Sequence, residues 1–179
     1  MFDFTGSPAP VRSDVVFAYR SVWHHLAGLG PTLTGEQRVA MLAAARNRTA
    51  EVLAPDLGRS TAWGGLIDTL YHEPRLVDGP MVRAAADIDG DATTVEAIAL
   101  VSILSSVDGT HRGLGIELEP LPEPRPGPPT GEIAEGLKRR RLHVPAPPGP
   151  IPFTLDLLPG EGAAFQSLFG SQYMTGMEM

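Results

Sequence analysis

The chain has 179 residues, 42% of them hydrophobic and 20% charged, which is enough for one domain with a hydrophobic core. Its formal net charge of −7 argues against binding of nucleic-acid phosphates, because such a surface needs an excess of lysine and arginine. The absence of cysteine excludes disulfides, thiolate nucleophiles, cysteine-ligated zinc and iron–sulfur clusters.

Four helices are predicted in the first half of the chain from apolar residues at three- and four-residue spacing. Each begins near a capping residue, and the first three end before glycine or proline, the usual signals for helix termini. The strongest start is Thr34 to Gln37, a capping-box sequence. The expected ranges are 13 or 14 to about 26, 34 to about 53, 60 or 61 to about 72, and 78 to 85.

A longer helix is predicted from Thr93 to Ile116. It carries no charge between Glu96 and Asp108 and is apolar on nearly every side, so other helices or another subunit must enclose it. Its uncharged run is too short for a membrane span, which needs about 20 apolar residues. The candidate N-cap residues are Asp91, Thr93 and Thr94.

No segment alternates apolar and polar residues in the way a strand does, so the predicted fold class is all-α. Eleven prolines between Pro120 and Pro152 exclude helix interior and central strand there and predict an extended arm, which wraps its own domain or reaches a neighbour. A last short helix can begin at Pro159. The predicted organisation is an N-terminal extension (1–12), a helical domain (13–118), a proline-rich arm (119–158) and a C-terminal helix and tail (159–179).

Three segments together resemble the alkylhydroperoxidase D-like and carboxymuconolactone decarboxylase-like superfamily. They are EAIALVSILSSVDGTHRGLG from Glu96, LTGEQRVA from Leu33 and LPEPRPG from Leu121, and the similarity covers about residues 13 to 128. The third segment is similar to actinobacterial members with a proline-rich extension. The resemblance implies a helical bundle of that type and a homo-oligomer, from dimer to hexamer.

In the peroxidase branch of this superfamily, a Cys-x-x-Cys pair and a following histidine carry the chemistry. The corresponding stretch here, Ala45 to Asp56, has neither residue, so thiol peroxidase or disulfide reductase activity is not expected. The resemblance then implies acid–base chemistry of the decarboxylase kind on a small organic acid or lactone, with no metal and no organic cofactor.

Asp108, His111 and Arg112 are the first candidate group, because their spacing places them on one face of the long helix. Asp108 would orient the His111 imidazole for catalysis, and Arg112 would hold a substrate carboxylate. The alternative is an ion pair between Asp108 and Arg112, with His111 half-buried at the helix end.

On the second helix, Glu36 with Arg38, and Arg48 with Glu51, lie on the side where the superfamily's pocket would open. Glu36 and Glu51 are further catalytic candidates, and Arg48 and Trp63 are further substrate-binding candidates. One carboxylate would face the cavity in place of the missing thiols. The alternative is that Arg48 and Glu51 form a solvated surface pair.

His24 and His25 are neighbours on the first helix, so their side chains diverge and cannot ordinarily share a metal ion. We expect one of them to face the core and the other to face water.

Three functions remain open: a cofactor-free acid–base enzyme, a non-catalytic binder of an apolar small molecule, and an interaction protein that clasps a partner with its arm and last helix. A cavity with convergent Glu, His and Arg side chains would favour the first of these. No secretion signal is visible at the N-terminus, and we expect a cytoplasmic protein with no nucleic-acid or membrane partner.

Overall fold

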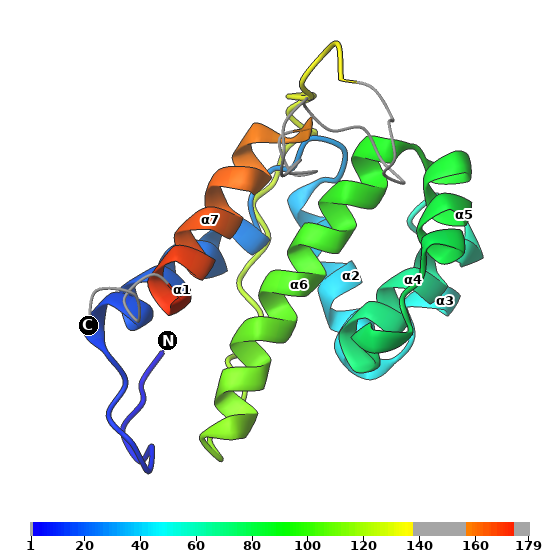
Figure 1. Cartoon of the computed structure of the whole chain (residues 1–179). Coiled ribbons are helices and arrows are strands. Elements are labelled where there is room, and N and C mark those ends of the chain that lie inside the picture. Colours follow the sequence, from blue (N-terminus) through cyan, green and yellow to red (C-terminus); the bar gives the residue numbers. More distant parts are fainter. Residues whose placement is uncertain (1, 138–156, 174–179) are drawn as a thin grey trace.

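The computed structural model describes residues 2–137 and 157–173, with the backbone alone for 169–173. Across these ranges the chain is helical and contains no strand, which confirms the all-α fold class (Figure 1). The rest of the predicted arm, 138–156, and the tail, 174–179, lie outside the described residues.

Two of the helix starts lie at the capping residues that the sequence predicts. The Ser60 side chain accepts a hydrogen bond from the Trp63 backbone, and Asp78 accepts one from Met81. The helices that agree with the sequence-based ranges are α1 (Ser13–Leu26), α4 (Thr61–His72) and α7 (Pro159–Tyr173), and a short 3-10 helix, η1 (Pro74–Leu76), follows α4. The fourth predicted helix, α5 (Gly79–Asp89), begins as expected but extends beyond residue 85.

The second predicted helix is wrong in its length, because it is divided into α2 (Gly35–Asn47) and α3 (Ala50–Leu53). The capping box at its start is present, but Arg48 adopts a left-handed conformation, with φ of 60°, and ends α2. The Asp68 carboxylate of α4 then accepts hydrogen bonds from the Ala50 and Glu51 amides at 3.1 and 3.2 Å. A side chain distant in sequence therefore fixes the break.

The long helix α6 (Asp91–Gly113) is the central element, with α1 and α7 on one side and α4 and α5 on the other (Figure 1). The predicted N-caps are wrong, since Gly90, at φ 89°, occupies the cap position and no side chain caps the helix. Among the described residues α6 is the one helix long and apolar enough to cross a membrane, but 67% of that stretch is buried inside the protein. This burial agrees with the predicted core helix.

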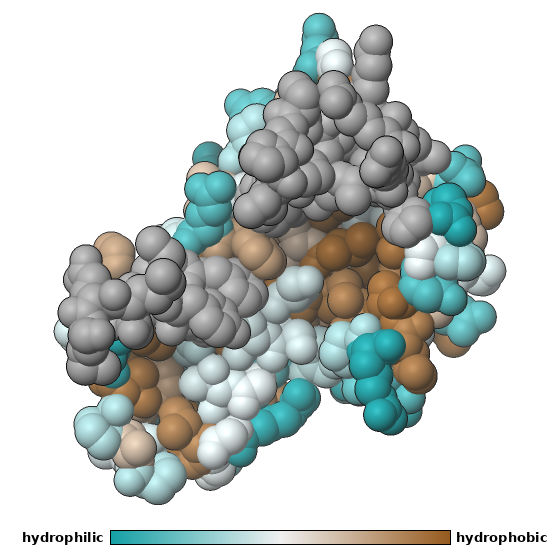
Figure 2. Space-filling model, viewed as in Figure 1, coloured by the Kyte–Doolittle hydropathy of each residue, from teal (hydrophilic) through white to brown (hydrophobic). Residues whose placement is uncertain are grey.

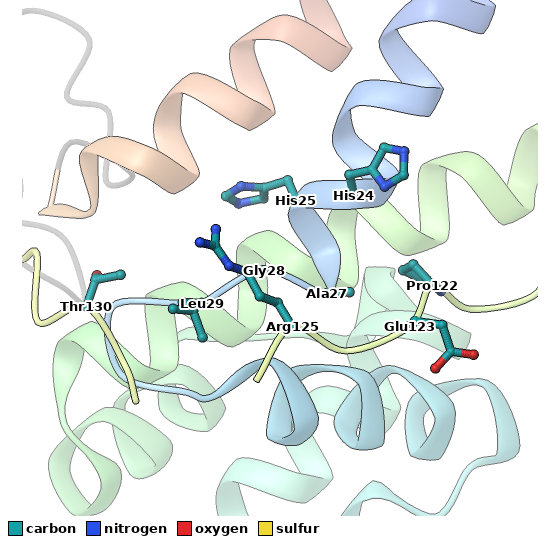
Figure 3. Close-up of a pocket in the computed structure, with 9 residues that line it drawn as sticks. All are labelled: His24, His25, Ala27, Gly28, Leu29, Pro122, Glu123, Arg125 and Thr130. Atoms are coloured by element: carbon teal, nitrogen blue, oxygen red, sulfur yellow. The ribbon is translucent and has the colours of Figure 1, made fainter. Parts of the chain in front are cut away.

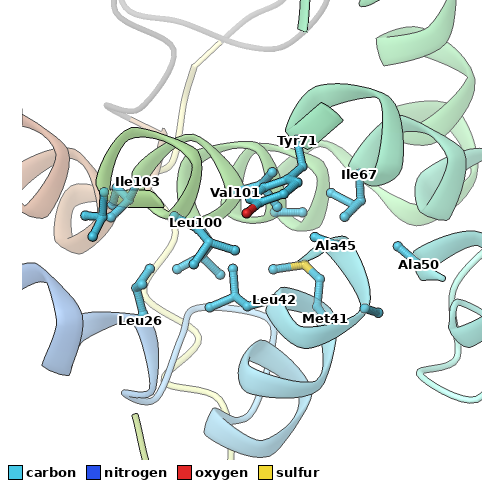
Figure 4. Close-up of a cluster of buried hydrophobic side chains, with 14 of the residues drawn as sticks. Leu26, Met41, Leu42, Ala45, Ala50, Ile67, Tyr71, Leu100, Val101 and Ile103 are labelled. Carbon is cyan, nitrogen blue, oxygen red and sulfur yellow. The ribbon is translucent and has the colours of Figure 1, made fainter. Parts of the chain in front are cut away.

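The hydrophobic core lies where α6 meets the surrounding helices. Leu100 and Val101 of α6 pack with Met41 and Leu42 of α2 and with Ile67 of α4, all of them inaccessible to solvent (Figure 4). The N-terminal segment also reaches this core, because the Phe2 ring packs edge-on against Trp23 at a centroid distance of 5.4 Å.

The described part of the arm lies along its own domain. The Arg125 amide donates to Ala27 O at 2.8 Å, and the Thr130 amide donates to Gly30 O at 2.7 Å. These bonds hold the arm beside the loop that follows α1. The arm was expected either to wrap its own domain or to reach a neighbour. Residues 119–137 therefore wrap their own domain.

Gly64 and Gly65 offer a matched test of the packing between α3 and α4. A Cβ on Gly64 would lie 2.5 Å from Ala50 O and from the Glu51 Cα, whereas a Cβ on Gly65 would meet nothing within 4 Å. We expect Gly64→Ala to lower the free energy of unfolding by about 1–3 kcal/mol, the usual cost of overpacking. Gly65→Ala should raise it by about 0.5–1 kcal/mol, because alanine is the better helix former. Urea unfolding of both variants measures the difference, and equal effects would contradict the close packing.

Candidate functional site

A pocket of about 800 Å³ opens between the end of α1 and the arm (Figure 3). The arm segment that is held by the hydrogen bonds of Arg125 and Thr130 forms one wall of the pocket. The turn after α1 forms the opposite wall. The Arg125 guanidinium extends toward the side of the pocket on which His25 lies. The lining residues are His24, His25, Ala27, Gly28, Leu29, Pro122, Glu123, Arg125 and Thr130.

His25 connects the pocket to buried charges behind it. Its Nε2 atom lies 2.7 Å from Glu161 Oε2. Glu161, from the first turn of α7, is 1% exposed, whereas 26% of the His25 side chain is exposed. Arg38 Nη2 lies farther from the same Nε2 atom, at 3.3 Å. Because an ionised carboxylate only accepts hydrogen bonds, the shorter contact assigns the proton of the neutral ring to Nε2 and leaves Nδ1 as the basic nitrogen. A buried carboxylate that orients an imidazole is a common arrangement in acid–base sites.

Arg38 neutralises Glu161 from the other side. Its Nη2 atom donates to Glu161 Oε1 at 2.6 Å, and its Nη1 atom donates to Gly28 O at 3.3 Å. Arg38 comes from the first turns of α2 and is inaccessible to solvent. Helices α1, α2 and α7 thus each contribute one side chain, His25, Arg38 and Glu161 respectively, to one cluster.

A second buried carboxylate, Glu96 of α6, lies on the far side of Arg38. Its Oε1 atom is 3.5 Å from Arg38 Nε, and its Oε2 atom accepts hydrogen bonds from the Thr32 amide and hydroxyl at 2.8 and 2.6 Å. Burial raises the pKa of the Glu96 carboxyl above its usual range, although the Thr32 hydrogen bonds and the Arg38 charge act to lower it.

The charges in this cluster do not balance when every acid is ionised. Arg38 brings one positive charge, and Glu96 and Glu161 bring two carboxylates. An excess negative charge is costly in a low-dielectric interior, so a proton on Glu96 stabilises the cluster. The raised pKa of Glu96 is the consequence of this burial.

No family model, curated protein or solved structure matches this chain.

The predicted group on α6 does not form a site of the expected kind. Asp108 is inaccessible to solvent and is bound by Arg46 at 2.8 and 2.7 Å and by the Tyr71 hydroxyl. The expected Asp108–Arg112 ion pair is wrong, since Arg112 donates to the Tyr71 hydroxyl at 2.7 Å. Burial, followed by the hydrogen bond to Asp108, raises the pKa of Tyr71 above its usual range.

His111 is buried rather than half-buried, with 2% exposure. Its Nδ1 atom donates to Glu117 O at 2.6 Å, and the rings of Phe2 and Phe4 lie against it at centroid distances of 5.9 and 5.4 Å. Its Nε2 atom is also buried and has no hydrogen-bond partner. The aromatic rings of the N-terminal segment thus cover the imidazole that was predicted to catalyse.

The other predicted residues lie apart from the pocket beside His25. Glu36 and Glu51 are exposed, and Arg48 pairs with Glu73 rather than with Glu51, so the expected surface pair is wrong in its acidic partner. Trp63 is inaccessible to solvent and belongs to the core. Glu51 does line a separate groove of about 530 Å³ between α4 and α5.

Sequence reasoning missed the residues that gather at the pocket. His25 was recognised only as one of two neighbouring histidines, and the structure places it half-buried while His24 is exposed. Arg38 was placed with Glu36 on the side of the second helix where a pocket was expected, but it was given no role. Nothing local marks Glu161, because its partner Arg38 is 123 residues away. Among the described residues no cluster of His, Asp and Glu has the geometry of a metal site.

Proposed function

We propose that this chain is a member of the alkylhydroperoxidase D-like and carboxymuconolactone decarboxylase-like superfamily and a cofactor-free acid–base protein for a small organic acid or lactone. The observation that carries the proposal is the His25–Glu161 contact of 2.7 Å at the edge of the pocket that Arg125 also lines. A cavity with convergent histidine, arginine and glutamate side chains favours an enzyme over a purely apolar binding site.

Each group has a chemical task in this proposal. The Arg125 guanidinium binds the carboxylate or lactone oxygen of the ligand, a role that suits its planar array of donors. The His25 Nδ1 atom takes a proton from the ligand or returns one, and Glu161 stabilises the imidazolium that forms. The apolar side chains of Leu29 and Pro122 contact the body of the ligand.

The alternative is a protein that binds such a ligand in the same pocket without turning it over. The third possibility, a clasp for a partner, is less well supported, because residues 119–137 bond to their own domain and α7 packs against α1. We retain the proposal of a cytoplasmic homo-oligomer, from dimer to hexamer. Apolar residues that gather on the visible surface beside α5 and α6 support self-association (Figure 2).

Benzoate and its neutral analogue benzamide test the carboxylate-binding step. We expect benzoate to shift the His25 ring signals in NMR titrations and benzamide to leave them unchanged. Arg125→Gln should weaken benzoate binding by about tenfold or more, because the charged hydrogen bond contributes about 1.5–3 kcal/mol. Arg75→Gln is the charge-matched control, since Arg75 is exposed on η1 and does not line the pocket. Equal shifts with benzoate and benzamide would contradict a carboxylate site.

The same variants separate the enzyme from the binder. An unsaturated lactone incubated in D2O acquires deuterium at carbon if the site transfers protons. His25→Gln should reduce that exchange by about 10²–10⁴-fold, the usual contribution of one acid–base group, while benzoate still binds. Binding without any exchange in the unmodified protein would favour the non-catalytic alternative.

A further inference from the structure

The two buried carboxylates behind the pocket make unequal contacts with Arg38. Glu161 receives a hydrogen bond of 2.6 Å from Nη2, whereas Glu96 lies 3.5 Å from Nε without hydrogen-bond geometry. Arg38 Nε and Glu96 Oε1 are accordingly both buried and without a hydrogen-bond partner. The guanidinium is bound to Glu161 and only adjacent to Glu96.

Glu96 Oε1 is confined on its other side by the backbone. A Cβ added to Gly30 would lie 1.8 Å from Oε1, so the space between the loop and this oxygen is smaller than a methyl group. Thr32 directs both of its hydrogen bonds to the other oxygen, Oε2. An ionised Glu96 would therefore gain most by drawing Arg38 toward itself, because a charged acceptor with no donor is costly in the interior.

Glu161 holds the first turn of α7 through this same arginine. Its other polar contact is His25, and the Gly162 amide donates to Leu158 O, which closes the first turn of α7 but does not join α7 to another helix. If Arg38 turned toward Glu96, Glu161 would lose its charged partner in a buried place. The start of α7 would then be less firmly held against α1 and α2.

We propose that Glu96 is a positioning residue that controls the docking of α7: uncharged Glu96 leaves Arg38 to Glu161, whereas ionised Glu96 competes for Arg38 and loosens the start of α7. Its consequence for His25 rests on the proposed function, because loss of Glu161 removes the carboxylate that orients the imidazole. The competition between the two carboxylates stands independently of any ligand.

The direction of the pH dependence follows from burial. A carboxyl whose pKa is raised in the folded protein contributes stability that is complete below its unfolded pKa and is lost as the pH rises through the folded pKa. The groups that face Glu96 are Arg38 from α2, Glu161 from α7 and, beyond them, His25 from α1. A proton on His25 also stabilises the Glu161 carboxylate. Loss of that proton as the pH rises therefore weakens the docking of α7, in the same direction as ionisation of Glu96.

Amide hydrogen exchange of α7 tests the proposal without a ligand. Protection factors of the amides of residues 162–168, corrected for intrinsic exchange, are measured from about pH 5 to about pH 9. In the unmodified protein we expect them to fall by up to about tenfold per pH unit where Glu96 ionises. Glu96→Gln keeps an acceptor for Thr32 and cannot ionise, so its protection should fall less steeply and stay higher at alkaline pH.

Two further variants make the result decisive. In the double variant His25→Gln Glu96→Gln, the remaining dependence of the protection factors on pH should disappear. Glu161→Gln, which also serves if Glu96→Gln does not fold, should give low protection at every pH, because Arg38 has lost the partner that docks α7. Equal slopes in the unmodified protein and in Glu96→Gln, or a persistent slope in Glu161→Gln, would overturn the proposal. Failure of benzoate to bind would leave these exchange results unchanged, so the two proposals fail separately.

Discussion

Arg38→Met is expected to lower the free energy of unfolding by about 3–5 kcal/mol at about pH 7, the usual cost of removing one partner from a buried ion pair. The guanidinium is inaccessible to solvent and separates two carboxylates that are 0% and 1% exposed. Methionine fills a similar length of space, so the loss reports charge rather than a cavity. Urea unfolding followed by the fluorescence of the buried Trp23 and Trp63 gives the value.

The dependence on pH and on the partners separates this cause from a packing defect. Without Arg38 both buried carboxylates lack a counter-charge, so the variant should lose stability as the pH increases and they ionise, and it should recover part of that stability near about pH 4. The triple variant Arg38→Met Glu96→Gln Glu161→Gln should regain most of the loss, since no buried charge remains. A loss that is the same at both pH values and in the triple variant would contradict the charge argument.

Asp108→Ala is expected to cost a similar amount, about 3–5 kcal/mol, because it leaves a charged partner without its counter-ion. Arg46 donates two hydrogen bonds to Asp108, at 2.8 and 2.7 Å, and its side chain is only 15% exposed. The Tyr71 hydroxyl would also lose its acceptor. Thermal or urea unfolding measures the loss.

Asp56→Ala is the matched control for this substitution. Asp56 is exposed beside α3, so the same change in charge there should alter the free energy of unfolding by about 0.5 kcal/mol or less. If Asp108→Ala were no more costly than Asp56→Ala, the buried position of Asp108 would not be structural. Such a result would return Asp108 to consideration as the functional carboxylate that the sequence predicted.

The helices were largely predictable because their signals are local. Ser60 and Asp78 cap α4 and α5 as their side chains predict, and the apolar run of α6 is buried as expected. The break at Arg48 was not predictable, since the residue is an ordinary helix former and the Asp68 side chain that caps α3 comes from the next helix. Tertiary contacts overrode local propensity there.

The predicted site was less successful because spacing on one helix does not reveal what packs against it. Asp108 and His111 share a face of α6. Arg46 and Tyr71 donate hydrogen bonds to Asp108. The N-terminal Phe2 and Phe4 rings cover His111. The sequence predicted on which face of the helix these side chains lie, but not which residues contact them.

The sequence by itself determined where most helices lie and which chemistry is excluded, because caps, periodicity and the absence of cysteine are properties of short segments or of composition. Only the tertiary structure decided which charges meet. Glu161 reaches Arg38 across 123 residues, and the arm brings Arg125 to the pocket beside His25 through hydrogen bonds to the loop after α1. Such contacts depend on the packing of whole helices, and no local pattern encodes them.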